Sequence, residues 1–69
     1  MKIGKRIRLE RLRMQLTQAQ LSKLVSVGSD VVSKYERDVI QPGAETLIKL
    51  ARVFGVTIDD LVGERSEAA

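Results

Sequence analysis

Apolar residues recur every three or four positions along almost the whole chain, and no stretch alternates cleanly between apolar and polar positions. This spacing places apolar side chains on one face of an α-helix. Capping residues, glycines and one proline divide the pattern into segments. The sequence therefore predicts a compact, all-α domain of five helices, which run over about residues 2–14 or 15, 18–24 or 25, 29–37, 44–54 and 58–62.

Two capping boxes mark the expected starts of the second and fifth helices. Thr17 precedes Gln20 by three residues, so its hydroxyl can accept the Gln20 N–H while the Gln20 side chain accepts the Thr17 N–H. Thr57 and Asp60 repeat this spacing. Gly55 suits the left-handed position that ends the fourth helix. We expect the domain to cover residues 1–62 and residues 63–69 to form a disordered tail.

The second and third predicted helices are short, and only about three residues, 26–28, connect them. Two short helices joined by so short a turn are typical of the helix-turn-helix motif. A turn of about 100° per residue gives the third helix two faces. Val32 and Tyr35 lie on the inward face. The outward face carries Asp30, Ser33, Lys34 and Arg37, with Ser29 at its flank.

The composition narrows the possible chemistry. The 69 residues fit one small domain, and cysteine and histidine are both absent. Their absence excludes disulfides, metal sites built from thiolates or imidazoles, and Cys–His or Ser–His catalysis. We therefore expect neither an enzyme nor a cofactor. No run of about 18 apolar residues predicts a membrane span.

Positive charge is concentrated at the start of the chain. Residues 1–13 hold six basic and one acidic side chain, whereas residues 14–69 hold six basic and eight acidic ones. A basic patch of this kind suits a polyanion such as nucleic acid or an anionic membrane surface. An ordinary solvated helix face is the alternative interpretation.

Several segments share their order and spacing with a known family. They are Thr17-Gln18-Ala19-Gln20-Leu21, Val32-Ser33-Lys34-Tyr35-Glu36-Arg37, Gln41-Pro42, Leu47 to Ala51, and Phe54-Gly55-Val56-Thr57-Ile58-Asp59-Asp60-Leu61. Together they resemble the phage-repressor and Cro family of five-helix DNA-binding domains, the XRE-like class. The resemblance covers roughly residues 3–62.

The resemblance implies a protein that binds double-stranded DNA with its third helix in the major groove. Lys34 suits guanine O6 and N7, and Asp30 can accept a hydrogen bond from cytosine N4. For each residue, a solvated helix surface is the alternative. The expected base-contacting residues are Ser29, Asp30, Ser33 and Lys34, and the expected phosphate-contacting residues are Gln18, Arg37, Lys5, Arg6 and Arg13.

Arg11 and Glu36 both fall on inward faces, and the resemblance implies an ion pair between them that joins the first helix to the third. A catalytic role for Glu36 is the alternative, but no nucleophile, base or metal ligand accompanies it. The third helix has few cations, so one copy should bind DNA only modestly. We therefore expect a homodimer, at least on DNA, with an interface formed by Val56, Ile58, Leu61 and Val62.

The turn departs from the family pattern, which usually reads Gly-Val-Ser, because this chain has Ser26-Val27-Gly28. A serine in the left-handed conformation costs about 1–2 kcal/mol. Either the turn is remodelled or the domain tolerates strain. Asp38 stands where glycine commonly follows the third helix, and aspartate tolerates that conformation better than most residues.

From these features we expect a repressor-like transcriptional regulator that reads a two-fold-symmetric operator. It would act in the cytoplasm of a prokaryotic cell or be encoded by a phage, with no membrane partner. The alternative is a protein-interaction module, antitoxin-like or an adaptor, on the same fold with weak DNA binding. Leu9 and Leu12 lie off the apolar stripe of the first helix, where they would pack against a neighbouring helix or serve such an interaction.

Overall fold

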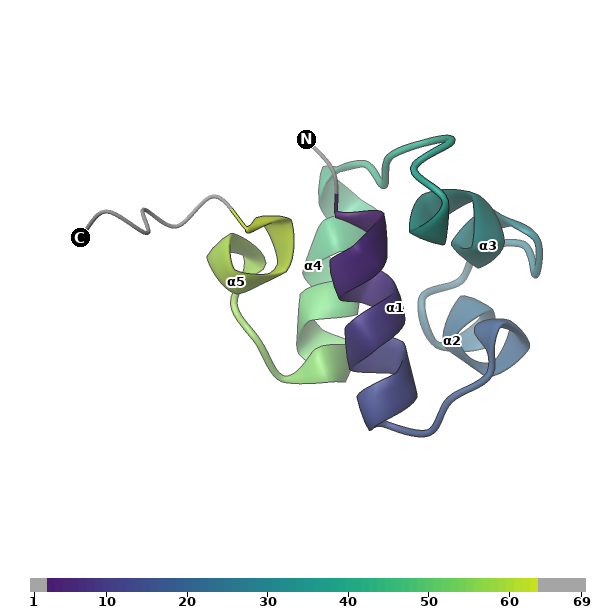
Figure 1. Cartoon of the computed structure of the whole chain (residues 1–69), viewed down its shortest axis with the longest axis horizontal. Helices are drawn as coiled ribbons and strands as arrows, with labels where there is room; N and C mark the ends of the chain where they lie inside the picture. The colour runs from purple at the N-terminus through teal and green to yellow at the C-terminus, as the bar shows by residue number, and fades with distance from the viewer. Residues whose placement is uncertain (1–2, 64–69) are drawn as a thin grey trace.

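A computed structural model describes residues 3–63, which form five α-helices (Figure 1). Within these residues no strand is present. The prediction of an all-α domain with five helices is therefore confirmed. The helices are α1 (Gly4–Arg13), α2 (Gln18–Leu24), α3 (Val31–Glu36), α4 (Ala44–Phe54) and α5 (Ile58–Val62).

The first helix is the central support of the fold. In Figure 1, α1 lies in the middle of the molecule with α4 behind it, α2 and α3 on one side, and α5 on the other. α1 packs against α3 and α5, α2 packs against α3, and α4 packs against α5. The position of α3 is therefore set by α1 and α2.

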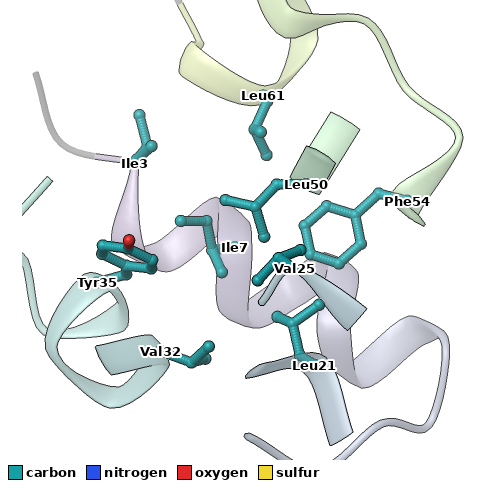
Figure 2. Packing of buried hydrophobic residues seen from close by; sticks show 9 residues of the cluster. All are labelled: Ile3, Ile7, Leu21, Val25, Val32, Tyr35, Leu50, Phe54 and Leu61. Carbon is teal, nitrogen blue, oxygen red and sulfur yellow. The ribbon is translucent and has the colours of Figure 1, made fainter. Parts of the chain in front are cut away.

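The core draws side chains from all five helices, from the residue before α1 and from the residue after α2 (Figure 2). Burying an apolar side chain of this size stabilises the fold by about 1.5–3 kcal/mol. Helices as short as these are not stable alone in water, so their shared core holds them in place. The buried cluster consists of Ile3, Ile7, Leu21, Val25, Val32, Tyr35, Leu50, Phe54 and Leu61.

Both predicted capping boxes are present. The Thr17 hydroxyl accepts the N–H of Gln20 at 3.0 Å, and the Gln20 side chain accepts the N–H of Thr17 at 2.8 Å. Thr57 and Asp60 make the same reciprocal pair. These local bonds explain why α2 and α5 begin where the sequence predicts.

Among the described residues, four helices end in a Schellman motif, in which the chain turns through one residue with left-handed backbone. The left-handed residues are Gln15, Ser26, Asp38 and Gly55, with φ of 58°, 60°, 59° and 70°. In each motif the residue after the left-handed one donates its N–H to the carbonyl five residues before it. Val27, for example, donates to the Ser22 carbonyl at 3.0 Å. The turn after α2 is thus not remodelled, and Ser26 adopts the strained conformation.

The expected start of α3 at Ser29 was wrong, because the α-helix begins at Val31. Ser29 and Asp30 form a turn that is closed by a hydrogen bond from the Val31 N–H to the Gly28 carbonyl at 3.0 Å. Gly28 has no side chain to cap a helix at residue 29. The expected tail, apart from Gly63, and the predicted first helical residue, Lys2, lie outside the described residues.

Five apolar side chains in the helices or at their ends are more exposed than the helical spacing predicts. Leu9 and Leu12 were expected to pack against a neighbouring helix, but they are 54% and 52% exposed on the outer side of α1. Met14 is exposed because α1 ends one residue earlier. Ile48 in α4 and Leu24 at the end of α2 are spaced to face the core, but they are also exposed.

Candidate nucleic-acid interface

The third helix has a buried face and an outward face. Val32 and Tyr35 point into the core (Figure 2), so the opposite side of α3 is turned to solvent. At the end of α3, the Nε of Arg37 donates to the Ser33 hydroxyl at 3.3 Å. The outward face holds the exposed Ser29, Asp30 and Arg37 and the half-buried Ser33 and Lys34.

An ion pair joins two residues of this outward face. The Nζ of Lys34 lies 3.4 Å from an Oδ of Asp30, one helical turn earlier. Asp30 occupies the N-cap position of α3, yet its carboxylate makes no hydrogen bond to the first turn of the helix. The side chain of Asp30 is 72% exposed and that of Lys34 is 43% exposed, so solvent reaches the pair and it contributes little to stability.

A second ion pair lies on the inner side of α3. The guanidinium of Arg11 in α1 donates to both carboxylate oxygens of Glu36, at 2.6 and 3.1 Å, and both side chains are buried. The remaining guanidinium nitrogen of Arg11, Nη1, donates to the Leu16 carbonyl at 2.8 Å. The ion pair expected between Arg11 and Glu36 is therefore present, and it ties α1 to the end of α3.

The sequence did not reveal that Gln18 belongs to the same network. Its Nε2 donates to a Glu36 oxygen at 3.1 Å, so the amide at the start of α2 is oriented by the end of α3. An amide nitrogen has two protons, and this bond uses one. The second proton is left for a group outside the network.

The start of α1 and the end of α3 are in unusually close contact. A Cβ placed on Gly4 would lie 2.5 Å from the backbone oxygens of Tyr35 and Glu36, so only glycine fits. The backbone N–H of Gly4 donates to the Asp38 carboxylate at 3.0 Å. Asp38 therefore serves two purposes, because it also supplies the left-handed residue after α3.

Two basic residues of α1, Arg6 and Arg13, lie on the side away from α3. Gly4 and Arg11 face α3, and Arg6 and Arg13 each follow one of them by two positions, which is about 200° around the helix. Both arginines donate to Glu10, at 2.9 and 3.2 Å, although the carboxylate of Glu10 is buried. Lys5 is exposed and directly follows Gly4, about 100° around the helix. The structure thus separates Arg6 and Arg13 from Gln18 and Arg37.

One residue of the expected dimer interface is part of the monomer core. Leu61 is 0% exposed, so it is not available to a second copy. Ile58 is exposed, and Val56 and Val62 are half-buried. The surface that remains near α5 is formed by Val56, Ile58 and Val62.

The sequence matches a family model described as helix-turn-helix over residues 7–61. The chain belongs to the helix-turn-helix family. Members of this family are DNA-binding regulator domains rather than a class of enzyme. Helices α2 and α3, joined by the turn at Ser26, form the motif that gives the family its name.

Helix-turn-helix regulators of bacteria and phages are similar to this chain. The transcriptional regulator ImmR of Bacillus subtilis is 34% identical over 93% of the chain, and repressor protein C2 of Salmonella phage P22 is 33% identical over 87%. The chain spans 50% and 28% of their lengths. The crystal structure of the P22 c2 repressor with a synthetic operator has a TM-score of 0.83 and 33% identity, covering 88% of this chain and 92% of that one.

The described part of this helix-turn-helix chain has neither a metal site built from acidic side chains nor a membrane-spanning helix. Residues 3–63 contain no cluster of acidic side chains that could hold a metal ion. None of the five helices is long and apolar enough to cross a lipid bilayer.

Proposed function

We propose that this domain binds double-stranded DNA in a sequence-specific manner and regulates transcription, as a repressor does. In this proposal α3 lies in the major groove with its outward face against the bases. The observation that carries it is the polar face of α3, held outward because Gly4 and the pair of Arg11 with Glu36 fix the other side to α1. The base-contacting residues are Ser29, Asp30, Ser33 and Lys34.

Two residues at the ends of the motif are assigned to phosphates. Gln18 has its amide oriented by Glu36 and can offer its second proton to a phosphate oxygen. Arg37 stands at the end of α3 and is exposed. Arg6 and Arg13 lie off this face, and we propose that they contribute only to the long-range potential that attracts DNA. Lys5 is exposed beside Gly4, and we propose that it contacts a phosphate.

We further propose that two copies bind a two-fold-symmetric operator, as expected from the few cations on one copy. The interface would use the surface of Val56, Ile58 and Val62 near α5. Sedimentation of the free protein and of its DNA complex tests this part. One copy per duplex on the selected operator contradicts it. A regulator of this kind works in the cytoplasm of a prokaryotic cell.

Selection from a random duplex library tests the main proposal. We expect enrichment of a two-fold-symmetric site whose affinity falls steeply between about 50 and 200 mM salt. No enrichment by folded protein at about 50 mM salt contradicts the proposal.

Matched variants connect the binding to α3. Arg37→Ala should weaken binding to every duplex. It should also lower the slope of log affinity against log salt concentration by about one, because one phosphate contact is lost. Arg52→Ala removes the same charge from an exposed position in the last turn of α4 and should leave binding nearly unchanged. Equal losses in the two variants would mean that only overall charge matters.

Exposed leucines favour a second candidate function, a protein-interaction module. Leu9 and Leu12 are the most exposed apolar side chains of α1, and they stand on its outer side next to the exposed Lys5 and Arg8. Under this alternative, substitutions on α3 would leave binding of the partner protein in cells unchanged. Replacing both Leu9 and Leu12 by serine would abolish binding of the partner protein.

A further inference from the structure

Asp30 places a negative charge on the surface that we propose meets DNA. Phosphates are anionic, and most atoms on the major-groove edges of bases are hydrogen-bond acceptors. A carboxylate there weakens binding to DNA in general. It helps only where the DNA offers a donor in the right place.

The chemistry of Asp30 and Lys34 is complementary. A carboxylate only accepts hydrogen bonds, and the donors in the major groove are cytosine N4 and adenine N6. An ammonium only donates, and it needs acceptors such as guanine O6 and N7. Both side chains stand on one face of α3, one helical turn apart, and the carboxylate of Asp30 does not cap the helix.

The spacing of the two groups fits one base pair. The Lys34 Nζ and the Asp30 Oδ are 3.4 Å apart. Guanine O6 and cytosine N4 are about 3 Å apart in a base pair, because they are hydrogen-bonded to each other. We infer that Asp30 and Lys34 form one specificity-determining unit that reads a G·C base pair, with Lys34 on guanine and Asp30 on the cytosine amino group. This inference rests on the proposed function.

An A·T pair also places a donor beside an acceptor, but it fits the unit less well. Guanine presents N7 next to O6, so the ammonium of Lys34 gains two acceptors on the same base. Thymine presents one acceptor, O4, with a methyl group beside it. The polarity of the unit therefore favours guanine under Lys34 and cytosine under Asp30.

The exposed ion pair makes this selection possible at little cost. Because both groups are solvated, exchanging their mutual contact for contacts with a base pair sacrifices little stability. A reversed base pair leaves the carboxylate facing acceptors, and an A·T pair leaves Lys34 with one acceptor in place of two. We expect discrimination of about 10- to 100-fold against other base pairs at this position.

Parallel duplex selections test the inference with the wild-type chain and four variants. Asp30→Ala should relax the base preference at one position in each half-site by about 10-fold or more. Asp30→Asn should shift the preference there to adenine, because an asparagine amide pairs with N6 and N7. Lys34→Ala should relax the same position. Asp59→Asn makes the same charge change on an exposed residue of α5 and should keep the wild-type site.

The outcomes separate this inference from the function beneath it. A wild-type chain that enriches no site contradicts the proposed function, and the inference fails with it. A wild-type site that Asp30→Ala and Asp30→Asn leave unchanged contradicts the inference alone. Relaxation of two different base pairs by the Asp30 and Lys34 variants also overturns it. Thermal unfolding of each variant verifies that all the chains compared are folded.

Discussion

The third helix takes part in two ion pairs that differ in burial, in contact distance and in the separation of their partners along the chain. On its inner side Arg11 and Glu36 are buried, with a shortest contact of 2.6 Å, and they join helices that are distant in sequence. On its outer side Asp30 and Lys34 are open to solvent, lie 3.4 Å apart and are separated by one helical turn. The inner pair fixes where α3 lies. The outer pair leaves its groups free to exchange partners.

Breaking the inner pair should have the largest effect on stability. Glu36→Ala leaves the buried guanidinium of Arg11 without its carboxylate and also removes a bond to Gln18. We expect a loss of roughly 3 kcal/mol in the free energy of unfolding, measured by urea denaturation. A loss under about 1 kcal/mol would show that the inner pair behaves like an exposed one.

The glycine contact beside the inner pair should come next. Gly4→Ala forces a methyl group against the backbone oxygens of Tyr35 and Glu36, so α1 and α3 must separate. We expect a loss of about 2 kcal/mol in the same assay. Gly43→Ser is the control, since nothing lies within 4 Å of its Cβ and serine can cap α4. Equal losses at both glycines would contradict the close contact.

The left-handed residues on either side of α3 should respond in opposite ways. Ser26→Gly relieves backbone strain, and we expect a gain of about 0.5–1 kcal/mol and a higher melting temperature. Asp38→Gly relieves similar strain but removes the bond to the Gly4 N–H, so it should bring no gain. An unchanged or lower melting temperature for Ser26→Gly would argue against strain at that turn.

The outer pair should have the smallest effect on stability. Asp30→Ala and Lys34→Ala should each change the free energy of unfolding by less than about 0.5 kcal/mol, because the pair is exposed. The same two variants should alter which duplexes are selected. If either destabilises the fold as much as Glu36→Ala does, the contrast between the two sides of α3 is lost.

Features that depend on local sequence were predicted well. The capping boxes and Gly55 place α2, α4 and α5 within the predicted bounds because their bonds join residues three to five positions apart. The start of α3 was misplaced because Gly28 provides no side chain that would mark it. The left-handed conformation of Ser26 followed from the position of a turn that the family resemblance had already located.

Features that depend on packing were predicted less completely. The bond between Gln18 and Glu36 joins residues 18 positions apart, and nothing local indicates it. Leu61 was assigned to a dimer because a five-residue helix does not reveal which of its faces is buried. The ion pairs of Glu10 could have been predicted from the sequence, since Glu10 follows Arg6 by four positions and precedes Arg13 by three. The separation of these arginines from α3 required the orientation of α1.

The hydrogen bond from Gly4 to Asp38 has a practical consequence for protein engineering. Any affinity tag or fusion partner joined ahead of Ile3 would begin beside the end of α3 and could obstruct an approaching duplex. The end of α5 lies across α1 from α3, as Figure 1 shows. Purification handles and fluorescent labels should therefore be attached after α5 when DNA binding is measured.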